Sequence, residues 1–110
     1  MKIVEIRGYQ VGYALPEPLA NANGVLRRRG ALIVEIVTDA GISGWGETMA
    51  SPEAAGGFMR ARLVPLLLGQ DPQRTGRLFH AMLAAINYDQ RGPAMMAISA
   101  VDMALHDAAA

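Results

Sequence analysis

Residues 31–48 read ALIVEIVTDAGISGWGET, and they carry the clearest structural pattern in the chain. The first half of this segment is rich in β-branched apolar residues, which is typical of a strand. TDAG, at residues 38–41, is a tight-turn sequence, so we expect the chain to return antiparallel as a β-hairpin. Gly44 and Gly46 alternate with larger residues and leave one face of the returning strand bare, so another element can lie close against it.

The residues before the hairpin predict one further strand and a long loop. Residues 2–13 alternate in polarity, and their apolar set changes face part-way, which indicates a strand with a bulge near Gly8. Residues 15–30 hold two prolines and an Asn-Ala-Asn-Gly tip, which is typical of a loop. With the hairpin strands at 31–38 and 42–49, the first half predicts a three-stranded antiparallel meander sheet.

The second half of the chain predicts three helices, the first of them over residues 52–68. Ser-Pro-Glu at residues 51–53 offers a hydroxyl N-cap, a proline and an acid in the first turn, which is typical of a helix start. Pro65 should bend this helix and Gly69 should stop it.

Two more helices complete an α+β fold. Asp-Pro at residues 71–72 predicts a helix over residues 72–88, and Pro93 opens a third helix whose small residues permit close packing. The expected core draws on both halves and includes the single tryptophan. Its predicted members are Ile6, Ile33, Ile36, Trp45, Leu63, Leu67, Leu78, Met82, Leu83 and Leu105.

The composition places the chain among globular domains. It has 110 residues, 52% of them hydrophobic and 18% charged, which excludes an intrinsically disordered chain. Ten basic residues balance ten acidic ones, which argues against nucleic-acid and membrane partners. The chain has no cysteine, which excludes disulfides and thiol chemistry and fits the cytoplasm. No targeting segment or bilayer-spanning stretch is visible.

Three motifs follow one another along the chain: TDAGISGWGE at residues 38–47, LLLGQDP at 66–72 and AISAVDMALHD at 97–107. In this order and spacing they resemble the N-terminal capping domain of the enolase superfamily, in its mandelate racemase/muconate lactonizing enzyme family. The resemblance covers essentially the whole chain. His106 stands where the family commonly has tryptophan.

The resemblance implies a two-part enzyme, of which residues 1–92 are the capping domain and residues 93–110 begin the helix that leads into a (β/α) barrel. In the family the barrel holds the Mg²⁺ ligands and the bases that take a proton from the carbon next to a carboxylate. Racemase, cycloisomerase and dehydratase activities stay open for the full-length enzyme, and the hairpin motif favours the mandelate racemase-like branch. Because the barrel is absent here, we expect no catalytic residue, metal ligand or cofactor in this chain, and no activity of the chain alone.

The resemblance also implies where substrate is shaped. The family's first loop and the segment after its hairpin close over the barrel mouth, and they correspond here to residues 15–30 and 49–57. The implied ligand is a small carboxylate. The predicted substrate-capping residues are Leu15, Asn21, Asn23, Val25, Met49, Ala50 and Ser51.

Several polar residues have both a functional and a structural interpretation. The arginines at residues 27–29 are suited to clamping a carboxylate, but such a run is more often a solvated entry to a strand. General-base or metal-ligand roles are conceivable for isolated acids and imidazoles, but their spacing does not bring ligands together. The structural interpretation is therefore favoured for Glu47, His80, Asp102, His106 and Asp107.

Two function classes stay open: the capping domain of a Mg²⁺-dependent enzyme, and a free-standing α+β binding or assembly module without an active site. The third helix has no C-terminal stop signal and is strongly apolar, so we expect the sequence to continue into something larger. A bare barrel-facing surface would favour self-association, so we also expect a homo-oligomer with the third helix in the contact.

Overall fold

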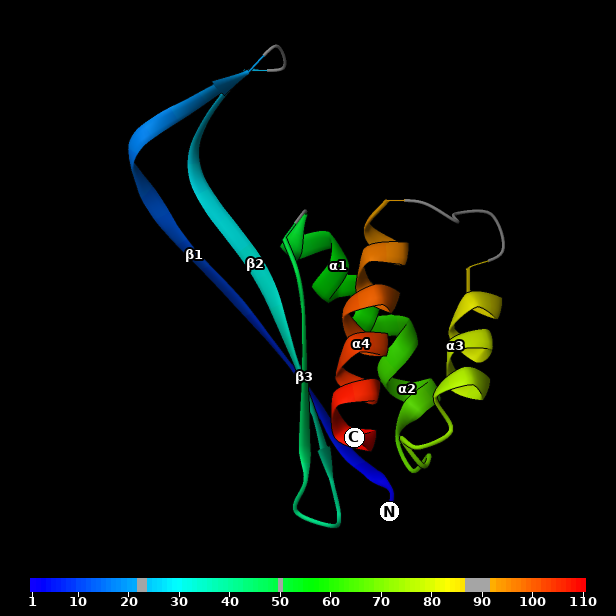
Figure 1. Cartoon of the computed structure of the whole chain (residues 1–110). Helices are drawn as coiled ribbons and strands as arrows, with labels where there is room; N and C mark the ends of the chain where they lie inside the picture. The colour runs from blue at the N-terminus through cyan, green and yellow to red at the C-terminus, as the bar shows by residue number, and fades with distance from the viewer. Residues whose placement is uncertain (22–23, 50, 87–91) are drawn as a thin grey trace.

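A three-stranded antiparallel sheet forms one side of the molecule, and helices cover one of its two faces (Figure 1). The strands are β1 (Ile3–Asn21), β2 (Gly24–Thr38) and β3 (Ser43–Thr48), paired in the order β1-β2-β3. The predicted α+β class and the meander sheet are confirmed. This computed structural model describes residues 1–21, 24–49, 51–86 and 92–110.

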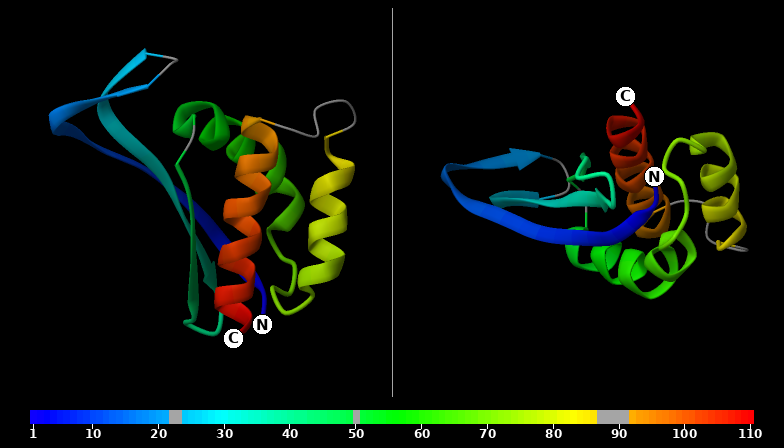
Figure 2. Two further views of the ribbon diagram at one scale, coloured as in Figure 1. Left: turned by 45° about the horizontal axis from the view of Figure 1, so that its top comes forward. Right: turned by 90° about the horizontal axis from the view of Figure 1, so that it is seen from below.

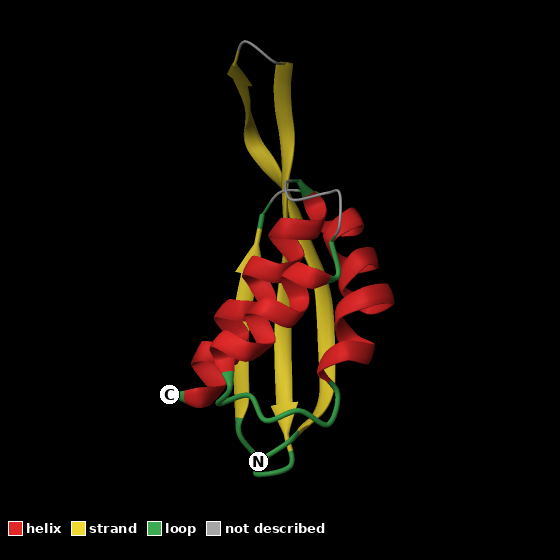
Figure 3. Ribbon diagram, turned by 90° about the vertical axis from the view of Figure 1, so that its right-hand side faces the viewer, coloured by secondary structure: helices red, strands yellow, loops and turns green. Residues whose placement is uncertain are grey.

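β1 and β2 are much longer than predicted and form a two-stranded arm that extends beyond the helices (Figure 3). The described part of residues 15–30, expected as a loop, lies in these strands, and Leu19 pairs with Leu26. The loop prediction is wrong because the prolines do not break the strand here. Both fall within the register shift between Ala14 and Leu19 on the edge strand β1, where a missing backbone donor is tolerated.

The irregularity at the start of β1 lies earlier than the bulge predicted near Gly8. The register shift falls between Ile3 and Glu5, so Val4 is the extra residue, and its side chain is exposed. This shift changes the alternation of the strand, so Ile3 and Ile6 both pack against the core. Gly8 itself lies in regular strand pairing.

The helical half begins with one interrupted helix made of α1 (Pro52–Phe58), η1 (Met59–Leu63) and α2 (Val64–Leu67). η1 is a turn of π-helix, in which the Val64 amide donates to the Met59 carbonyl. This wide turn directly precedes Pro65, whose ring and missing N–H disrupt α-helical pairing. The predicted bend is therefore a local change of helix type. Gly69 follows with a φ of 85°, as expected for a residue that ends a helix.

Two predicted helix starts differ from the structure. Ser51 is not a hydroxyl N-cap, because it has a φ of 48° and its side chain makes no capping hydrogen bond. α3 (Thr75–Ala84) begins later than residue 72, because Asp71 Oδ1 accepts a hydrogen bond from the Gln73 amide and holds a turn there. α3 also ends short of residue 88, which lies outside the described residues.

α4 (Pro93–Ala109) is the central helix of the molecule. It starts at the predicted proline, lies along β3 and also touches β2, α1 and α3 (Figure 2). The carbonyl oxygens of Ala100 and Ala104 stand where a Cβ would be placed on Gly46 and Gly44. The two glycines therefore admit the helix as predicted. The apolar residues of α4 are buried within this chain, against the sheet and the other helices.

Trp45 lies on the outer face of the sheet and is 48% exposed, so its predicted place in the core is wrong. The reason is the alternation of β3: the flanking glycines face α4, and the side chain between them must point the other way. Ile33 is only partly buried for the same reason, because it pairs with Glu47 and Tyr9 on that outer face.

The rest of the predicted core is confirmed between the sheet and the helices. Ile6 and Leu83 are partly buried and pack against it. The predicted core members that are buried are Ile36, Leu63, Leu67, Leu78, Met82 and Leu105.

Within the described part of the chain, no helix combines the length and apolar character that crossing a bilayer requires.

Gly46→Ala should lower the free energy of unfolding by about 3 kcal/mol, measured by urea denaturation. The added methyl group would meet only backbone atoms of α4, which cannot turn aside as a side chain can. Gly57→Ala is the matched control: nothing lies within 4 Å of that Cβ, and the change should raise helix stability by about 0.5–1 kcal/mol. Equal effects of the two substitutions would contradict the close approach of α4 to β3.

Candidate functional site

The two predicted capping segments lie at the same end of the sheet. Leu32 pairs with Thr48, so β3 ends where the β1–β2 arm leaves the sheet. A Cβ on Gly30, at the base of the arm, would stand 3.6 Å from Cγ of Pro52 at the start of α1. The segment that follows β3 therefore packs against the root of the arm (Figure 1).

The predicted capping residues fall in three kinds of place. Leu15, Asn21 and Val25 belong to the paired strands of the arm. Met49 and Ser51 flank the end of β3, where the Met49 side chain is 57% exposed. Asn23 and Ala50 lie outside the described residues.

A polar cluster that the sequence analysis missed lies on the outer face of the sheet. Glu35 is 8% exposed and accepts hydrogen bonds from the Tyr9 hydroxyl at 3.1 Å and from Arg7 Nη1 at 3.4 Å. Arg7 also donates to both carboxylate oxygens of Glu5, each at 2.8 Å. The Trp45 ring stacks on Tyr9, with ring centroids 6.2 Å apart. The available signal was one acid, Glu35, inside the otherwise apolar run of residues 31–37.

The electrostatics of this cluster are set by Arg7. Its hydrogen bonds to Glu5 lower the pKa of that carboxyl, because the guanidinium stabilises the charged form. The same bonds raise the pKa of Arg7 above its usual value. Glu5 and Arg7 are therefore both charged at neutral pH.

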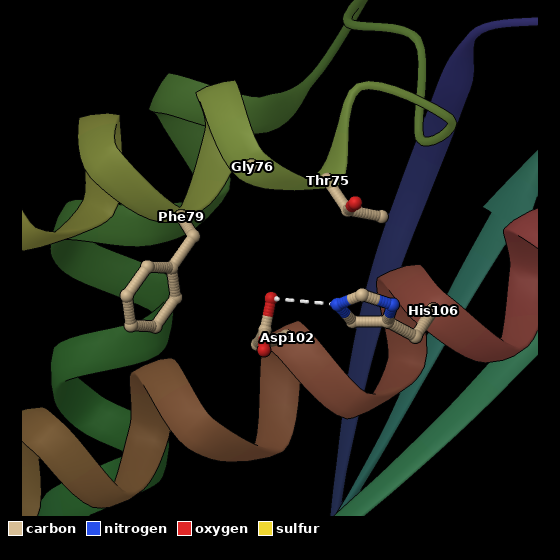
Figure 4. A pocket seen from close by; sticks show the side chains of 5 residues that line it. All are labelled: Thr75, Gly76, Phe79, Asp102 and His106. Atoms are coloured by element: carbon tan, nitrogen blue, oxygen red, sulfur yellow. Dashed lines mark ion pairs between the residues drawn. The ribbon is translucent and has the colours of Figure 1, made fainter.

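A shallow pocket of about 230 Å³ lies between α3 and α4 (Figure 4). Thr75, Gly76 and Phe79 line one side, and Asp102 and His106 line the other. His106 Nε2 lies 3.6 Å from Asp102 Oδ1, which has no hydrogen-bond partner in the described structure. One carboxylate and one imidazole are too few ligands for a tight metal site.

The other candidate polar residues are dispersed. Asp107 has a structural role, because its Oδ2 accepts a hydrogen bond of 2.8 Å from the Trp45 amide. Glu47 and His80 are exposed, and the arginines at residues 27–29 belong to the arm strand of β2. Among the described residues, no three His, Asp or Glu side chains are grouped to hold a metal ion, so these residues do not fit a Mg²⁺ site.

Comparison with known proteins points to one family. Residues 3–110 match the family described as "Mandelate racemase / muconate lactonizing enzyme, N-terminal domain". The chain is 32% identical over 108 residues to a D-galactarolactone cycloisomerase of Agrobacterium fabrum, covering 97% of this chain and 28% of that protein. It is 40% identical over 82 residues to the D-galactonate dehydratase family member RspA of Halomonas elongata, covering 72% and 20%.

The fold agrees with a solved relative. A racemase from Streptomyces coelicolor with bound magnesium superimposes with a TM-score of 0.91 at 28% identity, over 96% of this chain and 31% of that one. The chain therefore spans less than a third of the length of each of these three proteins.

NMR titration should place the pKa of the Glu5 carboxyl below the usual glutamate value. Because the folded-state pKa is the lower one, the pair with Arg7 stabilises the fold at neutral pH, and its contribution is lost as the pH falls through the lowered pKa. Arg7→Gln should return the Glu5 pKa toward its usual value. Arg77→Gln, on the exposed side of α3, should leave it unchanged. An ordinary Glu5 pKa in the unaltered protein would refute the pairing.

Proposed function

Since the chain belongs to the mandelate racemase/muconate lactonizing enzyme family as its N-terminal domain, we propose that it is the substrate cap of an enzyme that removes a proton next to a carboxylate. The observation that carries this proposal is the convergence of the arm and the segment after β3, which touch at Gly30 and Pro52. A lid built from two segments on a rigid sheet can cover a reaction centre and exclude water from it.

The substrate we propose is a sugar acid or its lactone. The Agrobacterium relative is named for D-galactarolactone and the Halomonas relative for D-galactonate. Racemisation, cycloisomerisation and dehydration of such acids can all begin with loss of the proton next to the carboxylate, so one kind of cap serves each of them.

Magnesium would be held by other parts of the full-length enzyme, since the described residues of this chain do not fit such a site. We therefore assign no chemical step to residues of this chain. Their part is to orient the substrate and to keep water away from it, through the arm and through Met49 and Ser51 beyond β3.

The chain alone should have neither racemase, cycloisomerase nor dehydratase activity, and no tight Mg²⁺ site. Proton removal next to a carboxylate creates a dianionic enediolate, which water stabilises poorly and which needs a grouped set of cationic or metal partners. The measurements are calorimetry with Mg²⁺ and α-proton exchange of mandelate and D-galactonate in deuterated buffer. Micromolar Mg²⁺ binding, or exchange above the buffer rate, would show that the chemistry lies in this domain.

The capping role is tested by grafting residues 1–110 in place of the matching domain of the Agrobacterium cycloisomerase. Replacing residues 15–28 of the graft by Asn-Gly should lower kcat/KM about a hundredfold, because the reaction centre is left open and the substrate less well placed. Ile42→Ser, at the opposite end of the sheet, is the control and should leave kcat/KM unchanged. Equal activity with and without the arm would rule out a capping role.

A further inference from the structure

We propose that the pocket between α3 and α4 binds a guanidinium group, carried either by a small free compound or by an arginine side chain. Thr75, Gly76 and Phe79 of α3 line the pocket together with Asp102 and His106 of α4. This site goes beyond the proposed function and does not rest on it, because the pocket uses none of the residues of the substrate cap.

The pocket contains a carboxylate oxygen that the described chain leaves unpaired. Asp102 Oδ1 is enclosed and accepts no hydrogen bond in the described structure. His106 Nε2 lies 3.6 Å from it, which is beyond hydrogen-bond distance. Because buried acceptors in folded proteins are almost always paired, this oxygen calls for a donor from outside the described residues.

The carboxylate can be reached from the pocket. The Asp102 side chain as a whole is 27% exposed, although its Oδ1 is enclosed. The χ2 angle of aspartate has a broad energy minimum, so a small rotation brings Oδ1 within reach of a bound group. Figure 4 shows the carboxylate between Phe79 and His106, with the Thr75 side chain across the pocket. A ligand in the pocket therefore has access to both carboxylate oxygens.

The charge of the pocket favours a cation. Asp102 is the one acid among the five lining residues, and none of the five is lysine or arginine. Within the described ranges its one ion pair is with His106, which is charged only when protonated. With a neutral imidazole, the Asp102 carboxylate has no cationic partner among the described residues, so an anion is repelled and a cation is attracted.

The residue types of the lining favour a flat cation over a metal ion. One carboxylate and one imidazole are too few ligands for a tight metal site. A guanidinium can instead donate two parallel N–H groups to the two oxygens of the Asp102 carboxylate. Its planar face can stack on the Phe79 ring, and the Thr75 hydroxyl can accept a further N–H. The volume of about 230 Å³ leaves room for this group and for the first carbons of the chain that carries it.

Binding is tested by NMR titration of the 110-residue chain with methylguanidine, following the ring signals of Phe79 and His106. The titration is run at constant ionic strength and about pH 8, where an imidazole is ordinarily neutral. We expect saturable shifts of both rings with a Kd of about 1–10 mM, because one small group makes few contacts. The absence of a saturable shift would overturn the proposal.

Two matched compounds separate the charge of the ligand from its shape. Methylurea has nearly the same planar shape as methylguanidine but no charge, so it should give no saturable shift. Methylammonium has the charge but no planar face and no fork of donors, so it should bind at least about threefold more weakly. An equal response to methylurea, or an equal affinity for methylammonium, would refute a guanidinium site.

A blocked Gly-Arg-Gly peptide distinguishes the two sources of the guanidinium. If an arginine side chain of another protein segment occupies the pocket, the peptide backbone adds contacts, and the peptide should bind at least about threefold more tightly than methylguanidine. Equal or weaker binding of the peptide assigns the pocket to a free guanidino compound.

Three variants locate the binding in the pocket. Asp102→Asn should weaken methylguanidine binding at least about tenfold, because it removes the charge and one acceptor but keeps the size of the side chain. Phe79→Leu should weaken it about threefold, because it removes the ring face. Glu53→Gln removes the same charge from an exposed position in the first turn of α1 and should leave the affinity unchanged.

Thermal unfolding establishes that each variant is folded, and the His106 ring signal serves as the readout in Phe79→Leu. If Asp102→Asn does not fold, Phe79→Leu and the methylurea comparison still decide the question. Unchanged affinity in the folded pocket variants, or an equal loss in Glu53→Gln, would show that methylguanidine does not bind between α3 and α4.

Discussion

The close approach of α4 to β3 is the constraint on which the rest of the fold depends. Backbone carbonyls of the helix occupy the space that side chains would need at Gly44 and Gly46. Because the helix lies directly on the strand, Asp107 reaches the free edge of β3 and accepts a hydrogen bond from the Trp45 amide. α1 and α3 then pack against α4. The close contact between α4 and β3 therefore positions both halves of the chain.

The opposite end of the sheet carries the two segments that we propose as the substrate cap. The arm continues β1 and β2 beyond a register shift between Ala14 and Leu19. Pro52 packs at the root of the arm beside Gly30, and it follows Ser51, whose left-handed backbone turns the chain from β3 into α1. The domain thus holds two segments that are distant in sequence together at one end of the sheet.

Features that depend on the local sequence were predicted correctly, and features that depend on contacts between strands were missed. The glycine alternation of β3, the helix stop at Gly69 and the helix start at Pro93 are local signals, and each is confirmed. The arm was missed because the tolerance of an edge strand for proline depends on which side of the strand is unpaired. Trp45 was misplaced because hydrophobicity was weighed above alternation, although Gly44 and Gly46 on either side already fixed its direction. The outer polar cluster depends on the cross-strand register, which no local pattern gives.

The two sides of β3 meet different constraints. Gly44 and Gly46 face the backbone of α4, so a larger residue at either position would displace the helix. The side chains of Trp45 and Glu47 are exposed on the other side of the strand, so substitutions there should leave the fold intact. The fold therefore depends on one alternating set of β3 positions, and the outer surface of the domain can change through the other set.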